Sequence, residues 1–284
     1  MDGIVAIDLD TIIPCLWISR WKKIPRIYDA HELFSEMKEV ISRPRIKMVW
    51  MRVEHYAVPQ YINGYTVSRT IAAEFRKRYG VEYGLIRNLP VLEEGTPYPD
   101  PPLAERFILY QGAVNEARGL ESLIGAMRHV DCRLVICGDG NRMAICRRLT
   151  EDYGLTGKII FRGMVDPAEL LKTTKKAYIG VNLVEPVGLN QYYSLANKFF
   201  DYIHAGIPQV TMDFPEYRFV NDRYPIGLLI PDIGEKKIAE ALNNLLKNDV
   251  LYGMFKENCQ QARLAYNWQE EEKALLRFYQ KIFG

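Results

Sequence analysis

Short apolar runs alternate with helix-like segments along almost the whole chain. The runs are mostly apolar rather than alternately apolar and polar, which is typical of strands in a parallel sheet that helices cover on both faces. The alternation therefore predicts an α/β fold with a helix between successive strands. The expected strands are residues 3–8, 26–30, 65–68 and 83–87, followed by residues 107–112, 133–140, 158–163, 177–183, 207–212 and 226–230.

A proline-rich stretch, residues 89–105, separates the two groups of strands. Its five prolines prevent a helix and interrupt a sheet ladder, so we expect a linker between domains. The prediction is one α/β domain over residues 1–88 and a second over residues 106–266. Residues 267–284 have apolar side chains at helical spacing, with acidic residues early and basic ones late. They are expected to form a helix that packs back toward the first domain.

The charge balance and the cysteines exclude several classes of protein. There are 37 basic and 35 acidic residues, a net charge of +2, far from the excess that a general nucleic-acid binder needs. The five cysteines are odd in number and lack close paired spacing, so neither a zinc site nor a disulfide framework is expected. A reducing cytoplasm fits this pattern best, and no apolar run is long enough to span a membrane.

Two basic clusters with aromatic neighbours leave two interpretations open. They are "SRWKK" at residues 19–23 and "RPRIKMVW" at residues 43–50. Such patches can dock on anionic lipid at the inner face of a membrane, or they can form a solvated helix face, which is the commoner arrangement. Peripheral membrane contact is therefore one partner hypothesis.

The segment "SLANKFFDYIHAG", residues 194–206, contains the most informative polar residues of the chain. On a helix that Ser194 caps and Gly206 ends, one face is polar and the opposite face is apolar. The polar face would carry Ser194, Asn197, Asp201 and His204, and the apolar face Leu195, Phe199 and Ile203. Either the polar stripe simply faces water, or the first turn binds a phosphate beside Lys198 while Asp201 accepts ribose hydroxyls.

A family resemblance favours the interpretation that this segment binds a ligand. The stretch "ANKFFDYIHAGIP" resembles the "P-N-K-x-x-E-Y-x-x-x-G-x-P" version of the signature of glycosyltransferase family 4, a GT-B type of two Rossmann-like domains. The resemblance implies that Asn197 and Lys198 lie near the phosphates and that Asp201 binds the ribose. Glu185 matches the first acid of the family's Glu-x7-Glu signature, near the transferred sugar, although fifteen residues separate it from Asp201.

Other segments resemble the same family. "LYQGAVNEARGL" resembles the loop after the first strand of its second domain, so that Gly112 and Arg118 would bind the diphosphate, although Ala113 replaces an expected basic residue. "FRGMV" resembles the segment whose main chain, here at Val165, lies against the nucleotide base. "YDAHE" places His31 at a strand end, where the family has a histidine near the donor sugar.

The motif "DLD" at residues 8–10 has two interpretations. It could be mistaken for a metal-binding Asp-x-Asp pair of the other major glycosyltransferase fold. It also resembles the family's "D-x-D-T" stretch, and helix capping by Asp10 or Thr11 is a sufficient explanation. No metal and no cofactor are expected.

The resemblance implies transfer of a sugar from a nucleotide diphosphate sugar to a hydroxyl of a sugar or lipid-linked acceptor. Retention of configuration and a place in polysaccharide or glycolipid synthesis follow from the same resemblance. A non-catalytic nucleotide-binding subunit is the alternative. An NAD-linked oxidoreductase is disfavoured because "ICGDGN" lacks the third glycine of its fingerprint.

The resemblance also implies that roughly the first half of the N-terminal domain is missing. Three explanations stay open: a truncated reading frame, a second chain that completes the domain, or dimerisation over the gap. A fragment of about ninety residues would leave an open strand edge and an uncovered apolar face.

Overall fold

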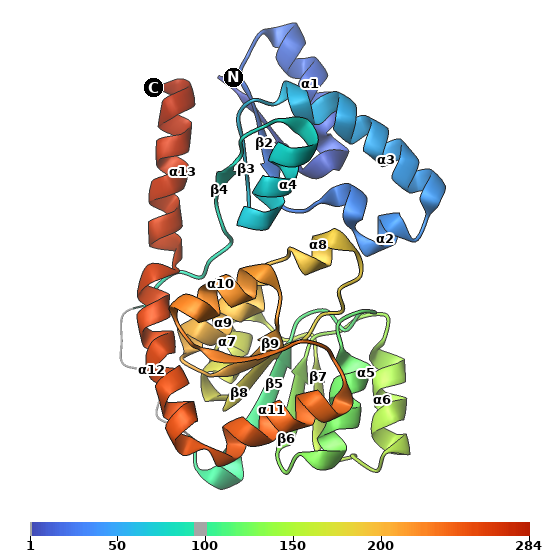
Figure 1. Cartoon of the computed structure of the whole chain (residues 1–284), viewed down its shortest axis with the longest axis vertical. Coiled ribbons are helices and arrows are strands. Elements are labelled where there is room, and N and C mark those ends of the chain that lie inside the picture. Colours follow the sequence, from blue (N-terminus) through green and yellow to red (C-terminus); the bar gives the residue numbers. More distant parts are fainter. Residues whose placement is uncertain (1, 94–100) are drawn as a thin grey trace. The chain divides into compact units, whose positions relative to one another are not determined.

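The computed structural model describes residues 2–93 and 101–284, which form two compact α/β units (Figure 1). Unit 1 comprises Met1–Leu89, Pro186–Leu195 and Trp268–Gly284, and unit 2 comprises Pro90–Glu185 and Ala196–Asn267. Residues 94–100, in the predicted linker, lie outside the described residues. Each predicted strand is present, most of them one to three residues shorter than expected.

Unit 1 contains a parallel sheet in the order β1-β2-β3-β4. Its strands are β1 (Ile4–Ile7), β2 (Arg26–Ala30), β3 (Gly64–Thr66) and β4 (Gly84–Leu85). Its helices include α1 (Asp8–Lys22), α2 (Lys38–Ile41), α3 (Pro44–Ala57) and α4 (Arg69–Tyr79). Neither Asp10 nor Thr11 caps α1, which corrects the prediction: the N-cap is Ile7, and Thr11 Oγ1 donates back to the Ile7 carbonyl at 2.6 Å.

The core of unit 1 is aromatic. Tyr28 packs against Tyr61, Phe75 and Tyr83 with ring centroids 5.8 to 6.0 Å apart. Such pairs contribute about 0.5–1.5 kcal/mol each beyond the burial of their surface. Strand β2 is thereby held to α4.

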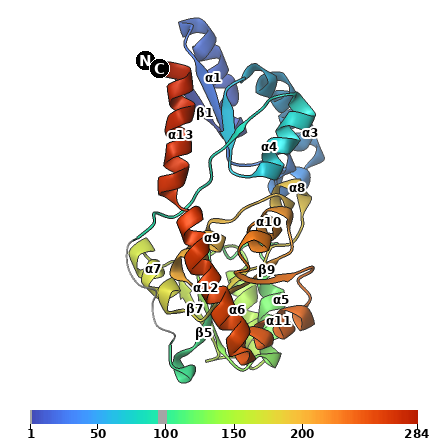
Figure 2. The ribbon, with the colours of Figure 1, turned by 60° about the vertical axis from the view of Figure 1, so that its left-hand side comes forward.

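The last helix, α13 (Trp268–Phe283), belongs to unit 1 and lies alongside its strands in both views (Figures 1 and 2). Arg87 Nε, just after β4, donates to Glu271 Oε1 at 2.9 Å. The rings of Tyr65 and Phe278 meet edge to face at 5.2 Å. A segment from the far end of the chain therefore completes this unit.

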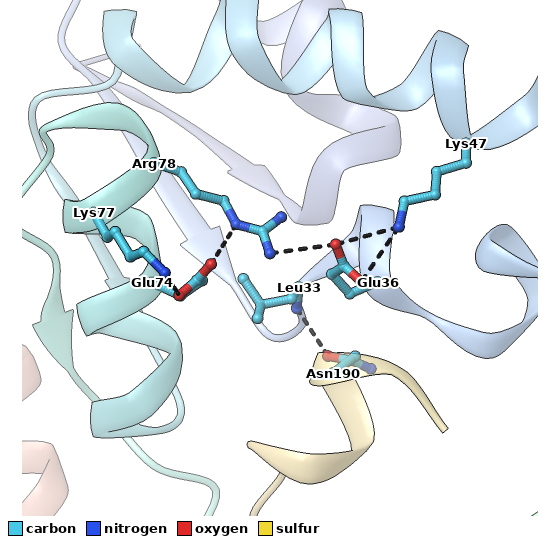
Figure 3. Close-up of polar contacts among 7 residues, drawn as sticks. All are labelled: Leu33, Glu36, Lys47, Glu74, Lys77, Arg78 and Asn190. Atoms are coloured by element: carbon cyan, nitrogen blue, oxygen red, sulfur yellow. Dashed lines mark hydrogen bonds and ion pairs between the residues drawn. The ribbon is translucent and has the colours of Figure 1, made fainter. Parts of the chain in front are cut away.

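Residues 186–195, here called the strap, also belong to unit 1, although both flanking segments belong to unit 2. The strap contains α8 (Gly188–Tyr192), and Leu189 and Tyr193 pack against the core of unit 1. The Leu33 N–H donates to Asn190 Oδ1 at 2.8 Å (Figure 3). The strap accounts for most of the interval between Glu185 and Asp201.

A charge network lies beside the strap contact. Glu36 accepts from Lys47 and from Arg78, and Arg78 Nε donates to Glu74 Oε1 at 2.6 Å (Figure 3). These half-buried pairs join the residues that follow β2 to α3 and α4. The part of unit 1 that receives the strap is thus held in place by charged hydrogen bonds.

Unit 2 contains a six-stranded parallel sheet in the order β10-β9-β8-β5-β6-β7. Its strands are β5 (Phe107–Gln111), β6 (Arg133–Cys137), β7 (Ile159–Gly163), β8 (Ile179–Asn182), β9 (Gln209–Met212) and β10 (Gly227–Ile230). Its helices include α5 (Leu120–Ala126), α6 (Met143–Asp152), α7 (Pro167–Lys176), α9 (Asn197–Ala205), α10 (Pro215–Arg223), α11 (Glu235–Lys247) and α12 (Asp249–Ala265).

Helix α9 begins later than predicted. Its N-cap is Ala196, whose N–H donates to the Tyr217 hydroxyl at 3.1 Å, so Ser194 is not the cap. Ser194 Oγ instead donates to the Gln191 carbonyl within the strap at 2.8 Å, and Leu195 precedes the helix rather than joining its apolar stripe. The predicted end is confirmed, because Gly206 is the C-cap with φ +72°. Phe199 and Ile203 are fully buried, as the apolar stripe requires.

Candidate functional site

The candidate site lies at the carboxyl ends of β5 and β8. In the strand order, β5 has β6 as its neighbour on one edge and β8 as its neighbour on the other, with β9 and β10 beyond β8. The direction of winding therefore reverses between β5 and β8, where ligands bind in open parallel sheets. Gly112 follows β5, Glu185 lies three residues after the end of β8, and α9 begins after the strap.

Two glycines let the loops after β5 and β6 meet closely. Gly138, after β6, has φ +145°, and a Cβ on it would lie 1.9 Å from the Gly112 carbonyl oxygen. The Gly112 N–H in turn donates to the Cys137 carbonyl at 2.9 Å. Only glycine fits at Gly138, and this close approach fixes the path of Gly112.

Lys198, the second residue of α9, is a buried cation whose Nζ has no hydrogen-bond partner within the described residues. Nζ lies 4.0 Å from the centroid of the Tyr110 ring and 3.7 Å from the position that a Gly112 Cβ would occupy. Burial, and then the charge of Arg118, lower the pKa of Lys198 to about 7, against the opposing effect of Asp201. An anion at Nζ would relieve both unfavourable effects.

Asp201, one turn further along α9, is held by β5. Gln111 Nε2 donates to Asp201 Oδ2 at 2.8 Å, and Gln111 Oε1 accepts from Thr174 Oγ1 of α7 at 2.7 Å. Burial raises the pKa of Asp201 to about 6, while the Gln111 hydrogen bond and Lys198 oppose this rise. Gln111 and Thr174 were not predicted as site residues, because a glutamine at a strand end has no distinctive sequence signal.

Arg118 and Glu185 are brought together through Ala117. Ala117 is a buried residue with φ +63°, a left-handed conformation that is strained for a residue with a Cβ. Its carbonyl accepts the Glu185 N–H at 3.0 Å. The next residue, Arg118, is half-buried and close enough to affect the pKa values of Lys198 and Tyr110.

The remaining predicted donor residues lie on elements of the same sheet end. Asn197 is exposed at the first position of α9. Val165, between β7 and α7, packs its side chain against the apolar cluster that contains Tyr202. The structure therefore brings Gly112, Arg118, Lys198 and Asp201 together, while Asn197 directly precedes Lys198 on α9 and Val165 packs in an apolar cluster.

His31 belongs to unit 1, directly after β2. Its ring Nε2 lies 3.1 Å from Asp29 Oδ1, and its main-chain N–H donates to Asp8 Oδ1 at 2.9 Å. The hydrogen bond to Asp29 raises the pKa of His31, although burial opposes it. Asp8 has φ +54°, so its backbone is strained where its carboxylate holds His31. Asp8 was not predicted to hold His31. Its position directly after β1 could have indicated this role, but the interpretation of "DLD" as a metal motif or a helix cap obscured it.

No metal site is found among the described residues. Residues 2–93 and 101–284 contain no group of three or more His, Cys, Asp or Glu side chains that could hold a metal ion. All five cysteines are free thiols. In the same ranges, no helix combines the length and the apolar character that crossing a bilayer requires.

Comparisons with known proteins agree on a family. The sequence family described as "Glycosyl transferases group 1" matches residues 99–262. A phosphatidyl-myo-inositol mannosyltransferase of Mycobacterium leprae (strain TN) is 27% identical over 190 residues, which are 64% of this chain and 48% of that protein. The chain thus spans about half the length of this curated relative.

Solved structures are similar over nearly the whole chain. HepE of Anabaena, in complex with UDP, has a TM-score of 0.80 at 13% identity, covering 99% of this chain and 79% of that one. Sucrose-phosphate synthase from Thermosynechococcus elongatus has a TM-score of 0.82 at 19% identity, covering 99% and 74%. At these identities the likeness concerns the fold, and the predicted α/β fold of the GT-B type is confirmed.

Proposed function

Because the chain belongs to the group 1 glycosyl transferases, we propose that it moves a sugar from a nucleotide diphosphate sugar to a hydroxyl acceptor, without a metal ion. The observation that carries this proposal is Lys198. A buried ammonium without a hydrogen-bond partner is costly, and an anion of matching size would offset that cost. HepE, of similar fold, has been solved with UDP and with UDP-glucose, which supports a diphosphate as that anion.

The chemistry that this site has to perform is stabilisation of a leaving group. As the glycosidic bond opens, negative charge grows on the departing diphosphate. Lys198 and Arg118 would meet that charge with preorganised cations, of which Lys198 is buried. Gly112, without a side chain, would let the phosphates approach the main chain closely.

The other residues have binding roles in this proposal. Asp201 binds the ribose, the main chain at Val165 lies against the base, and Asn197 assists at the phosphates. Glu185 and His31 position the sugar. A raised pKa keeps more of His31 in the imidazolium form, which can donate to a sugar hydroxyl.

Calorimetric titration with UDP, GDP and ADP tests the binding claim. Lys198→Met should weaken the best ligand about 10- to 100-fold, because it removes a charge-assisted contact to phosphate. Asp201→Ala should also weaken it, whereas Lys237→Met, at an exposed lysine of α11, should leave affinity unchanged. Equal affinity in wild type and Lys198→Met would contradict the proposal.

The finer activity is retaining transfer in polysaccharide or glycolipid synthesis, inside the cell. Its support is the family and the curated relative, whose name refers to a mannosyl transfer on a phosphoinositide lipid. A sugar or lipid-linked hydroxyl is the proposed acceptor. NMR of the anomeric proton in the product, with and without EDTA, would test both the stereochemistry and the independence of metal.

A non-catalytic subunit that needs a second chain is the other candidate. It is favoured by Ala113, which replaces a basic residue, and by β1, an edge strand beside exposed apolar side chains. Ile7 is 54%, Trp17 62% and Trp21 80% exposed. Nucleotide binding without donor hydrolysis by the isolated chain would favour this candidate, and hydrolysis would exclude it.

The second partner that we propose is an anionic membrane, which the protein would contact at its surface. Helix α3 exposes Met48 at 50% and Val49 at 56%, while its one acidic residue, Glu54, is buried. Residues 43–53 contain three arginines, one lysine and no acidic residue. A pocket of about 510 Å³ lies on the same helix, lined by Ile41, Pro44, Lys47, Met48, Met51, Arg52 and His55. Apolar side chains interleaved with cations match an anionic lipid surface.

A further inference from the structure

Gln111 connects two elements of unit 2 through its side-chain amide. It is the last residue of β5 and is 4% exposed. Its Nε2 lies 2.8 Å from Asp201 Oδ2 on α9, and its Oε1 lies 2.7 Å from Thr174 Oγ1 on α7. Thr174 is 1% exposed, so most of this chain of hydrogen bonds is shielded from water.

The chemistry of the three groups fixes the orientation of the amide. An ionised carboxylate only accepts hydrogen bonds, so Asp201 requires the NH₂ end of Gln111. The Thr174 hydroxyl then donates to Oε1, and it shares its single proton with the Leu170 carbonyl at 2.8 Å. Asp201 therefore selects the amide orientation, and the Thr174 hydroxyl is compatible with it because it can donate to Oε1.

We propose that Gln111, supported by a hydrogen bond from Thr174, is a positioning residue that presents the ionised carboxylate of Asp201 to the ribose hydroxyls of the donor. This inference rests on the proposed function and names a residue that the family signature does not contain. The bond to Gln111 occupies Oδ2 and leaves Oδ1 for a ligand. Without it, the buried carboxyl group would rotate and take up a proton more readily.

Gln111 is a principal polar support of the Asp201 carboxylate, as the charged groups around Asp201 indicate. Lys198, on the same helix, is the charged group that affects the Asp201 carboxylate. The facing residues of β5 and α7 are the uncharged Gln111 and Thr174. Arg118 affects Lys198, and Arg263 of α12 affects His204 instead.

Gln111→Leu removes the donor at nearly constant volume, and Gln209→Leu is the matched control. Gln209 is a fully buried glutamine whose Nε2 donates to the Phe199 carbonyl of α9 at 3.1 Å. It supports the same helix without contacting Asp201. If Gln111→Leu does not fold, Thr174→Val tests the same chain of hydrogen bonds, with a smaller effect in the same direction.

Two measurements distinguish positioning from a general loss of structure. UDP, GDP and ADP are titrated beside their 2′,3′-dideoxy analogues, and the carboxyl signal of Asp201 is followed by NMR against pH without ligand. In wild type and Gln209→Leu the hydroxyls should improve affinity about tenfold, as a hydrogen bond to a charged group does. In Gln111→Leu this ratio should fall toward one, and the pKa of Asp201 should rise.

Each outcome has a distinct meaning. An unchanged ratio and an unchanged pKa of Asp201 in Gln111→Leu, with normal binding by wild type, would overturn the role of Gln111 alone. If wild type bound none of the nucleotides, the proposed function would fail and the ribose role with it. An equal loss of the ratio in Gln209→Leu would reduce Gln111 to one of several structural supports of α9.

Discussion

Lys198 and Asp201 lie one turn apart on α9, and burial moves their pKa values toward each other. The pKa of Lys198 falls to about 7 and that of Asp201 rises to about 6. Both groups therefore titrate close to neutral pH, where their ordinary counterparts are fully charged. A buried cation without a hydrogen-bond partner lowers the stability of the ligand-free protein, which agrees with the binding role that we propose.

The stability of the ligand-free protein should depend on pH through Lys198. The unfolded chain holds this proton up to a pH near 10.5, whereas the folded protein loses it near 7. Between these values the unfolded state binds more protons, so the free energy of unfolding rises with pH. Lys198→Met lacks this contribution and should be more stable than wild type at pH 6, by roughly 1–3 kcal/mol, with the excess shrinking toward pH 10.

Urea unfolding of both proteins at pH 6, 8 and 9.5 measures this difference. Lys237→Met, at an exposed position, should follow wild type at every pH. Parallel pH profiles for wild type and Lys198→Met would show that Lys198 is not buried as a strained cation.

At the scale of elements, the loops after β5 and β6 form the floor of the site. Gly138 and Gly154 both have positive φ, but their surroundings differ. A Cβ on Gly138 would meet the Gly112 carbonyl oxygen at 1.9 Å, whereas a Cβ on Gly154 would meet no atom within 4 Å among the described residues. Alanine substitutions at these two glycines therefore separate the cost of an unfavourable φ from the cost of steric overlap.

Gly138→Ala should therefore destabilise unit 2 by more than about 3 kcal/mol, through strain and overlap together. Gly154→Ala should lose only about 1 kcal/mol, the cost of a left-handed alanine. Thermal unfolding and nucleotide titration of both variants provide the comparison. Similar losses in the two variants would mean that the two loops separate easily.

Prediction from the sequence succeeded for strands and failed at the strap, for physical reasons. Strands such as Phe107–Gln111 are buried on both faces, and their local pattern shows this directly. Ser194 resembles a helix cap locally, but its hydroxyl bonds within the strap, which is held by Leu33 far away in sequence. The Gln111–Asp201 bond also joins distant residues, and periodicity carries no information about such pairs.

At the scale of the whole molecule, the surface of α3 should decide whether the protein associates with membranes. Arg45 and Arg52 are exposed on this helix. Arg45→Glu with Arg52→Glu should reduce binding to phosphatidylglycerol vesicles at least tenfold, since each cation near an anionic surface contributes about 1 kcal/mol. Lys236→Glu with Lys237→Glu on α11 makes the same change of charge elsewhere.

Vesicle sedimentation measures the effect, with phosphatidylcholine vesicles and high salt as conditions that should abolish binding. A similar loss in both double variants would indicate attraction by net charge alone. Undiminished binding of the α3 variant would remove this helix from the proposed contact.

Unit 1 is assembled from three separate stretches of chain, and this has a consequence for biosynthesis. During translation, β1 to β4 emerge before unit 2, the strap follows after about a hundred residues of unit 2, and α13 follows the rest of unit 2. Arg87 can meet Glu271 only after the intervening segments of unit 2 have been synthesised. Unit 1 must therefore remain partly folded until α13 has been synthesised, and during that interval chaperones and proteases have their best access to it.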